Sequence, residues 1–199
     1  MLKLWQRRPR RMSEHYAGIK FSLSLTRQGL EADSRCAEMI SWCRELARRG
    51  LCAHGDGNLS FRCRPGELGF VITGAGQAFE RGLRSEHCCL VKQVDISSGH
   101  VKAHGLVDPS SESMLHWCLY RARADVHAVV HGHGELAMEC AQAAGHPVTR
   151  ERVAYGSLEL ALQAEELARH SDVLVLREHG VVCLGSDLNE AARLALDLL

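Results

Sequence analysis

The stretch AVVHGH at residues 128–133 carries the strongest structural signal in this sequence. Its β-branched run predicts a buried strand, and residues two apart on a strand point to the same face. His131 and His133 would then lie about 6–7 Å apart along the backbone, where both imidazoles can bind one ion at about 2.0–2.1 Å. The alternative is a pair of solvated histidines at a strand end, because short motifs also occur by chance.

A catalytic metal needs a third ligand and an open position. His179, in the segment REHG at residues 177–180, is the best candidate because it lies at a break between two apolar stretches. Glu112, in PSSE at residues 109–112, is a further candidate in the expected first turn of a helix, where the helix dipole favours a carboxylate. The simpler interpretation is that Ser110 or Ser111 caps this helix and Glu112 only completes its first turn.

Two glycine-rich turns are candidates for binding an anion. GDGNLS at residues 55–60 leads into an expected strand, and TGAG at residues 73–76 leaves one. Turns of this kind can direct backbone N–H groups at a phosphate, and the N-terminus of a helix that starts near residue 110 can do the same. Both turns can equally be plain hairpin connections.

The composition narrows the class of protein. The 199 residues carry 24 Lys+Arg and 24 Asp+Glu, so no global field favours nucleic acid or a membrane surface, and no apolar run approaches the roughly 18 residues of a membrane helix. Residues 1–30, which include four arginines at positions 7, 8, 10 and 11, are expected to form a basic and partly flexible arm. Nine cysteines without a two-residue spacing indicate reduced thiols in a cytoplasmic protein.

The periodicity of the remaining chain predicts one α/β domain over residues 31–199, with a mixed and mainly antiparallel sheet. The expected helices span 33–49, 110–123, 135–144, 157–170 and the end of the chain from 187. The expected strands span 19–25, 58–63, 68–73, 89–94, 101–103, 126–131, 173–176 and 181–184.

The order of the motifs resembles the class II aldolase/adducin family from about residue 37 to the C-terminus. The matching segments are GNLS (57–60), ITGAG (72–76), PSSES (109–113), HGH (131–133), EHG (178–180) and a closing helix. The resemblance implies a three-layer αβα fold, with a central sheet between helix layers, and fourfold tetramers with sites between subunits. Members include aldolases of fuculose and rhamnulose phosphates, an epimerase, a dehydratase, decarboxylases and the non-enzymatic adducin head.

The resemblance also implies roles for individual residues. His131, His133 and His179 would bind a divalent metal, usually zinc, and Glu112 would be the general acid/base. The positions that hold the substrate phosphate in relatives are Asn58, Thr73, Gly74, Ser110 and Ser111. Asp56 and Asp108 add negative charge beside these turns, which disfavours a phosphorylated substrate unless the carboxylates point away.

The expected function is therefore a metal-dependent lyase that cleaves a carbon–carbon bond through an enediolate. Its substrate would be a small sugar phosphate or a related hydroxy-carbonyl compound. An epimerase, dehydratase or decarboxylase reaction is the alternative within the family, and a non-catalytic interaction module like adducin is the alternative outside catalysis. The joint presence of three candidate ligands and Glu112 favours an enzyme, because an interaction module does not need them.

Overall fold

The computed structural model describes residues 18–30, 33–52 and 55–199. The strands are β1 (Ser22–Thr26), β2 (Asn58–Arg62), β3 (Phe70–Thr73), β4 (Cys88–Asp95), β5 (His100–Gly105), β6 (Ala128–Gly132), β7 (Val173–Leu176) and β8 (Gly180–Gly185). The helices are α1 (Ser34–Arg48), α2 (Ser113–Ala122), α3 (Glu135–Ala143), α4 (Leu158–Ala168) and α5 (Leu188–Leu196), with short 3-10 turns η2 (Phe79–Arg81) and η3 (Ser85–His87).

The strands form one sheet in the order β1-β5-β4-β3-β2-β6-β8-β7. Only the β1–β5 pair is parallel among the pairings of these strands. The prediction of a mixed, mainly antiparallel sheet is confirmed. Part of the expected N-terminal arm joins this sheet as β1, whereas the arginines at positions 7, 8, 10 and 11 lie outside the described residues.

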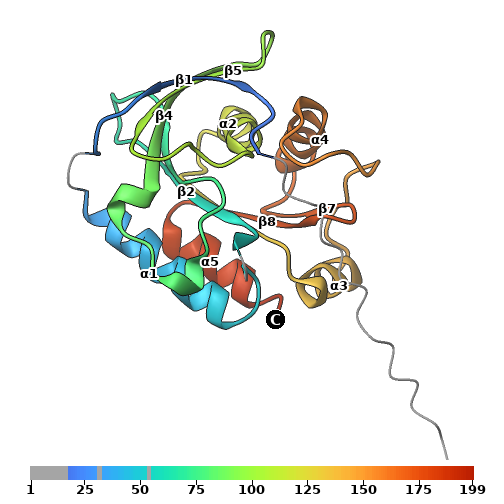
Figure 1. Cartoon of the computed structure of the whole chain (residues 1–199). Coiled ribbons are helices and arrows are strands. Elements are labelled where there is room, and N and C mark those ends of the chain that lie inside the picture. Colours follow the sequence, from blue (N-terminus) through green and yellow to red (C-terminus); the bar gives the residue numbers. More distant parts are fainter. Residues whose placement is uncertain (1–17, 31–32, 53–54) are drawn as a thin grey trace, which may run out of the picture.

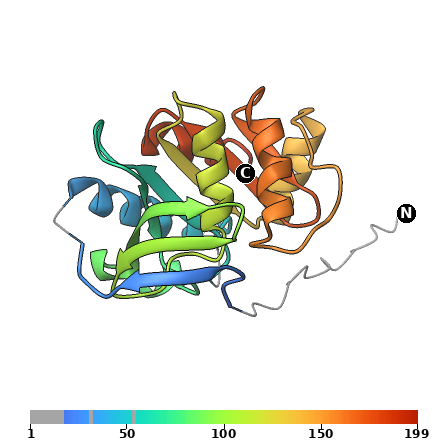
Figure 2. The ribbon, with the colours of Figure 1, turned by 90° about the horizontal axis from the view of Figure 1, so that it is seen from above.

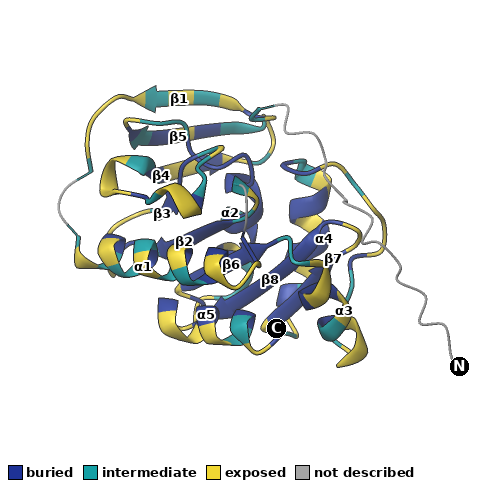
Figure 3. Ribbon diagram, turned by 60° about the horizontal axis from the view of Figure 1, so that its bottom comes forward, coloured by how far each residue is buried: buried dark blue, intermediate teal, exposed yellow. Residues whose placement is uncertain are grey.

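Helices cover both faces of the sheet. In Figure 1, α1, α3 and α5 lie below the sheet and α2 and α4 lie above it, and Figure 2 shows α2 and α4 side by side on their face. Successive side chains of β6 point to opposite faces of the sheet. Val130 packs in the core with α1, α3 and α5, and Val129 packs in the core with α2 and α4. Figure 3 shows the central strands buried between these layers. The predicted three-layer α/β architecture is confirmed.

The ends of α1 follow the chemistry of its flanking residues. Asp33 accepts a hydrogen bond from the backbone N–H of Arg35 at 2.9 Å and so caps the helix. At the other end Gly50 has φ +85°, the left-handed conformation that glycine adopts without strain.

The start of α2 differs from the expected serine cap. The helix begins at Ser113, so Glu112 occupies the N-cap position with φ −99° and ψ 19°, and its side chain makes no capping bond. The Ser110 hydroxyl instead accepts from the backbone N–H of Glu112 at 3.3 Å. The Glu112 carboxylate is therefore not used by its own helix and is available for contacts elsewhere.

The cysteines are reduced, as expected from the sequence. All nine cysteines are free thiols, and the adjacent Cys88 and Cys89 pack into cores on opposite faces of the sheet. Burial raises the pKa of both thiols to about 12, so neither is reactive at neutral pH. None of the described helices has the length and apolar character that a bilayer crossing requires.

Candidate metal centre

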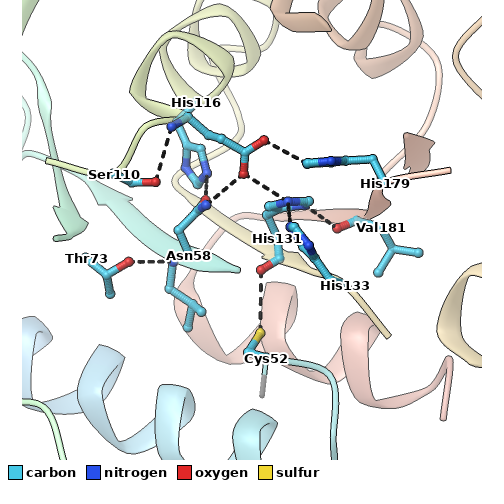
Figure 4. A network of polar contacts seen from close by, with 11 residues as sticks. Cys52, Asn58, Thr73, Ser110, His116, His131, His133, His179 and Val181 are labelled. Atoms are coloured by element: carbon cyan, nitrogen blue, oxygen red, sulfur yellow. Dashed lines mark hydrogen bonds and ion pairs between the residues drawn. The ribbon is translucent and has the colours of Figure 1, made fainter. Parts of the chain in front are cut away.

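Four side chains from distant parts of the chain converge at one point of the sheet. His131 lies on β6, His133 follows directly after it, His179 lies in the turn between β7 and β8, and Glu112 lies at the start of α2. Their candidate ligand atoms all lie within 4.8 Å of one another, and each side chain is buried except that of His133, which is partly exposed. Figure 4 shows the three imidazoles turned toward each other.

The strand pairing of β6 orients His131. β6 lies between β2 and β8, and His131 stands opposite Asn58 on one side and Val182 on the other. Its Nδ1–H donates to the Val181 carbonyl at 2.9 Å. Because a carbonyl can only accept, this bond assigns the ring hydrogen to Nδ1 and directs the Nε2 lone pair into the cluster, as the outer partners of metal-bound histidines do.

Gly132 separates the two histidines for a packing reason. A Cβ at this position would lie 2.6 Å from Leu51 Cγ and 2.9 Å from the Leu51 carbonyl oxygen. The backbone N–H of His133 donates to that same carbonyl at 2.9 Å. The segment that follows α1 therefore fixes His133 just beyond the strand, with its Nε2 2.8 Å from Nε2 of His131.

A tight turn places His179. Its backbone N–H donates to the Leu176 carbonyl at 3.0 Å, and the preceding Glu178 has φ +54°, the one positive φ among the described non-glycine residues. The His179 ring stacks on that of His131 at 5.1 Å between centroids and 7° between planes. At Gly180 a Cβ would lie 2.9 Å from the His131 ring, so the absence of a side chain there lets the two rings stack.

The Glu112 carboxylate contacts the imidazole nitrogens directly. Oε1 lies 2.9 Å from Nε2 of His179, and Oε2 lies 2.9 Å from Nε2 of His131. Burial alone would raise the pKa of Glu112, but when His131 and His179 are protonated on both ring nitrogens, their positive charge and hydrogen bonds outweigh it and hold the pKa well below its usual range. Glu112 is therefore an ionised, buried carboxylate.

The donor set fits a divalent cation. The His131 hydrogen is committed to Val181, so its Nε2 and the carboxylate oxygen 2.9 Å away would repel each other unless a positive charge, either a proton or a metal ion, lies between them. Burial and the neighbouring histidines lower the pKa of His133 well below its usual value, which keeps this imidazole neutral and able to act as a ligand. Imidazole nitrogens and a carboxylate oxygen are common ligands of zinc in proteins.

The residues expected at a phosphate also come together, beside this cluster. The backbone N–H of Ser110 donates to the Thr73 carbonyl at 3.1 Å, and Gly74 forms a bridge with Pro109. The Thr73 hydroxyl accepts from the backbone N–H of Leu59 at 3.3 Å, next to Asn58. All five expected residues are buried: Asn58, Thr73, Gly74, Ser110 and Ser111.

The two acidic residues near these turns differ in their surroundings. Asp108 lies 3.5 Å from the Arg27 guanidinium at a half-exposed surface, so a cation offsets its negative charge. Asp56 is exposed between Gly55 and Gly57. The cation beside Asp108 reduces its expected conflict with an anionic substrate.

Sequence reasoning missed three polar residues behind the centre. His116 and Tyr120 on α2 and Ser60 on β2 are buried and hydrogen-bonded to one another. The available signal was spacing: positions 112, 116 and 120 are four apart and share one helix face. Polar groups repeated on the face of a helix that packs on a sheet predict a buried network.

Comparisons with known proteins agree with this architecture. A family model described as "Class II Aldolase and Adducin N-terminal domain" matches residues 37–198. The chain is 29% identical to L-fuculose phosphate aldolase of Methanocaldococcus jannaschii over 169 residues, covering 77% of this chain and 86% of that protein. It is 31% identical to the protein of the same name from Methanococcus maripaludis, with the same coverage.

A relative with another activity and two solved structures extend the comparison. Methylthioribulose-1-phosphate dehydratase of Pectobacterium atrosepticum is 27% identical over 183 residues, covering 78% of this chain and 85% of that protein. A solved L-fuculose 1-phosphate aldolase superposes with a TM-score of 0.72 at 25% identity and covers 85% of this chain and 84% of its own. A sugar-phosphate aldolase from Thermotoga maritima has a TM-score of 0.70 at 21% identity, covering 83% and 90%. On the match over residues 37–198, this chain belongs to the class II aldolase and adducin family.

Proposed function

We propose that this protein is a divalent-metal-dependent lyase that cleaves a carbon–carbon bond in a small sugar phosphate or a related hydroxy-carbonyl compound. The observation that supports this most strongly is the buried convergence of three imidazoles and one carboxylate. Burying an ionised carboxylate among imidazoles costs desolvation free energy. Its presence here therefore favours a functional role over a structural one. The relatives named L-fuculose phosphate aldolase support the same reaction class.

In this proposal His131, His133 and His179 hold the metal, and zinc fits their nitrogen donors. A metal bound there would polarise the substrate oxygens and offset the negative charge that bond cleavage leaves on the enediolate. His131 contributes through its orientation, because the hydrogen bond to Val181 keeps its Nε2 directed into the site. His133 is the ligand nearest to solvent and marks the side from which substrate enters.

Glu112 is the proposed general acid/base. Its carboxylate is ionised and buried beside the metal ligands, where it could accept the proton of the hydroxyl group whose carbon–carbon bond breaks and deliver it to the carbon that cleavage leaves as an enediolate. Oε2 is held by a hydrogen bond from the Asn58 amide at 2.9 Å. Oε1 lies 2.9 Å from Nε2 of His179 and is the oxygen proposed to move toward substrate once the imidazoles bind a metal.

The far end of the substrate is proposed to bind at the neighbouring turns. The hydroxyls of Thr73, Ser110 and Ser111 and the second N–H of Asn58 would donate to a phosphate beside Gly74, whose own N–H donates to the His87 carbonyl. A homotetramer and a cytoplasmic location are further parts of the proposal, supported by the family resemblance and by the free thiols. The division into an arm (1–30) and a catalytic domain (31–199) belongs to it as well.

The test is a turnover assay on metal-loaded protein with L-fuculose 1-phosphate and unphosphorylated L-fuculose, together with elemental analysis. We expect wild-type protein to hold one metal per chain and to cleave a substrate. Glu112→Gln should keep the metal and lose turnover, and His133→Ala should lose the metal. Glu159→Gln, an exposed carboxylate on α4, is the matched control that should change neither. Metal-loaded wild-type protein that cleaves neither compound would refute aldol cleavage of this substrate class.

A dehydratase is the second candidate, because one relative is named methylthioribulose-1-phosphate dehydratase. Dehydration begins with removal of a proton from a carbon beside a carbonyl, and aldol cleavage ends with delivery of a proton to such a carbon, so the same Glu112 could serve either. Turnover of methylthioribulose 1-phosphate with loss of water, without cleavage of L-fuculose 1-phosphate, would select the dehydratase. Absence of bound metal and of turnover on all three compounds would instead select an interaction module.

A further inference from the structure

A chain of buried polar side chains runs from the metal centre into the core beneath α2. Glu112 Oε2 accepts from Asn58 Nδ2 at 2.9 Å, and Asn58 Oδ1 contacts Nε2 of His116. On the far side of the ring, His116 Nδ1 lies 2.6 Å from the Ser60 hydroxyl, and that hydroxyl lies 2.7 Å from the Tyr120 hydroxyl. Figure 4 shows Asn58 and His116 in contact beside the three histidines.

The chemistry of these groups permits one direction of donation along the chain. An ionised carboxylate can only accept, so the Asn58 amide presents its NH2 to Glu112 and its carbonyl oxygen to His116. His116 must then carry its hydrogen on Nε2. Its bare Nδ1 accepts from the Ser60 hydroxyl, whose oxygen accepts in turn from Tyr120.

Burial keeps this chain neutral and separated from water. Each of the four residues behind Glu112 is at most 5% exposed. Burial lowers the pKa of His116 to about 3, although Glu112 opposes the shift, and burial also raises the pKa of Tyr120. His116 stacks on Phe70 at 6.2 Å between ring centroids, which fixes the plane of its imidazole. Among these hydrogen-bonded side chains, only Glu112 therefore carries a charge.

We propose that His116 is a positioning residue for Glu112. Its Nε2–H holds the carbonyl of Asn58, and the amide so fixed can only donate to Oε2 of Glu112. If the amide turned over, its oxygen would face the carboxylate and repel it. His116 thus determines which carboxylate oxygen is anchored and leaves Oε1 for proton transfer. This role rests on the proposed function of Glu112, whereas the orientation of the amide does not.

A space-filling core histidine and a positioning histidine predict different results for substitution. Phe has a similar shape and could replace a histidine that only fills space. A positioning histidine requires a donor on the Asn58 side, and glutamine can supply one from its amide. Leu119→Ala is the matched control, because Leu119 is a fully buried core residue on the same helix without a polar role.

The kinetic experiment compares these variants in the metal-loaded holoenzyme at a temperature where all are folded. We expect His116→Phe to lower kcat by about 10- to 100-fold, with KM and metal content unchanged, and His116→Gln to recover most of the lost kcat. Leu119→Ala should lower the thermal midpoint without lowering kcat. A kcat for His116→Phe equal to that of wild type would overturn the proposal. Equal losses in the Phe and Gln variants would also overturn it.

The second measurement needs no substrate. In ¹⁵N-labelled metal-free protein at pH 7, two-bond ring correlations should show His116 with hydrogen on Nε2 and a bare Nδ1. The Asn58 side-chain NH2 should exchange slowly with water in wild type and in Leu119→Ala, and faster in His116→Phe. Hydrogen on Nδ1, or NH2 exchange that His116→Phe leaves unchanged, would overturn the positioning role. A failure of turnover in wild type would refute only the proposed function, because these spectra do not depend on it.

Discussion

Gly180 is the position where one added methyl group tests the geometry of the metal centre. Gly180 begins β8 and follows His179 directly. Its φ lies outside the positive region, so alanine has no backbone conflict there, and the conflict is one of space. A Cβ would lie 2.4 Å from the Gly132 carbonyl oxygen and 2.9 Å from Cε1 of His131.

The size of the effect follows from these distances. Ordinary van der Waals contact begins at 3.4 Å, so Gly180→Ala requires about 1 Å of local movement between β6 and β8. Overpacking of this kind costs about 1–3 kcal/mol of unfolding free energy. The same movement displaces His131 against His179, and misplacing a ligand through its surroundings lowers metal affinity by about 10- to 100-fold.

Gly185→Ala is the matched control at the other end of β8. There a Cβ would lie 2.5 Å from the backbone nitrogen of Ala191 and 2.8 Å from the Asp187 carbonyl oxygen, a similar clash next to α5. Urea unfolding of the metal-free proteins should show comparable destabilisation for both variants. Competition of each variant with a chromogenic chelator for Zn²⁺ should show weaker binding only for Gly180→Ala. Wild-type affinity in Gly180→Ala, or an equal loss in Gly185→Ala, would refute the argument.

Three further predictions concern stability. Asp33→Ala should lower the unfolding free energy by about 1 kcal/mol, measured by urea titration, because α1 loses its cap. Glu178→Gly should raise it by up to about 1 kcal/mol, because glycine adopts φ +54° without strain and the exposed ion pair with Arg152 contributes little; a lower thermal midpoint would contradict this. In metal-free protein the unfolding free energy should fall as pH drops from about 6.5 toward 3, because the unfolded state protonates His116 there and the folded state does not. His116→Phe should reduce this slope by up to about 1.4 kcal/mol per pH unit, and an unchanged slope would count against a buried neutral His116.

Local patterns predicted most of the elements because each is encoded within a few residues. The apolar run before His131 gave the central strand, and the strand at 173–176 has the expected bounds. The start of α2 was misplaced because serine is a common cap, whereas here the Glu112 side chain is drawn to two distant histidines. The parallel β1–β5 pair depends on a partner almost eighty positions away, which local periodicity does not contain.

In the candidate site too, local motifs predict the candidate ligands, whereas contacts between residues far apart in the sequence were not predicted. The spacing of His131 and His133 predicts that they share a face, and the turn motif around His179 marks a third donor. The packing of Leu51 against Gly132 cannot be foreseen, because Leu51 belongs to the segment after α1, far from Gly132 in the sequence. The contact of Asn58 with His116 was missed for the same reason: strand β2 and helix α2 meet only in the folded protein.

The central claim is that three histidines of this chain hold one divalent metal, and X-ray absorption spectroscopy at the zinc edge tests it most directly. For protein loaded with one equivalent of Zn²⁺, we expect scattering from three imidazoles with zinc–nitrogen distances of about 2.0–2.1 Å. His179→Ala should lose one of the three. A wild-type spectrum with fewer than three imidazoles, or the same spectrum in His179→Ala, would contradict the account.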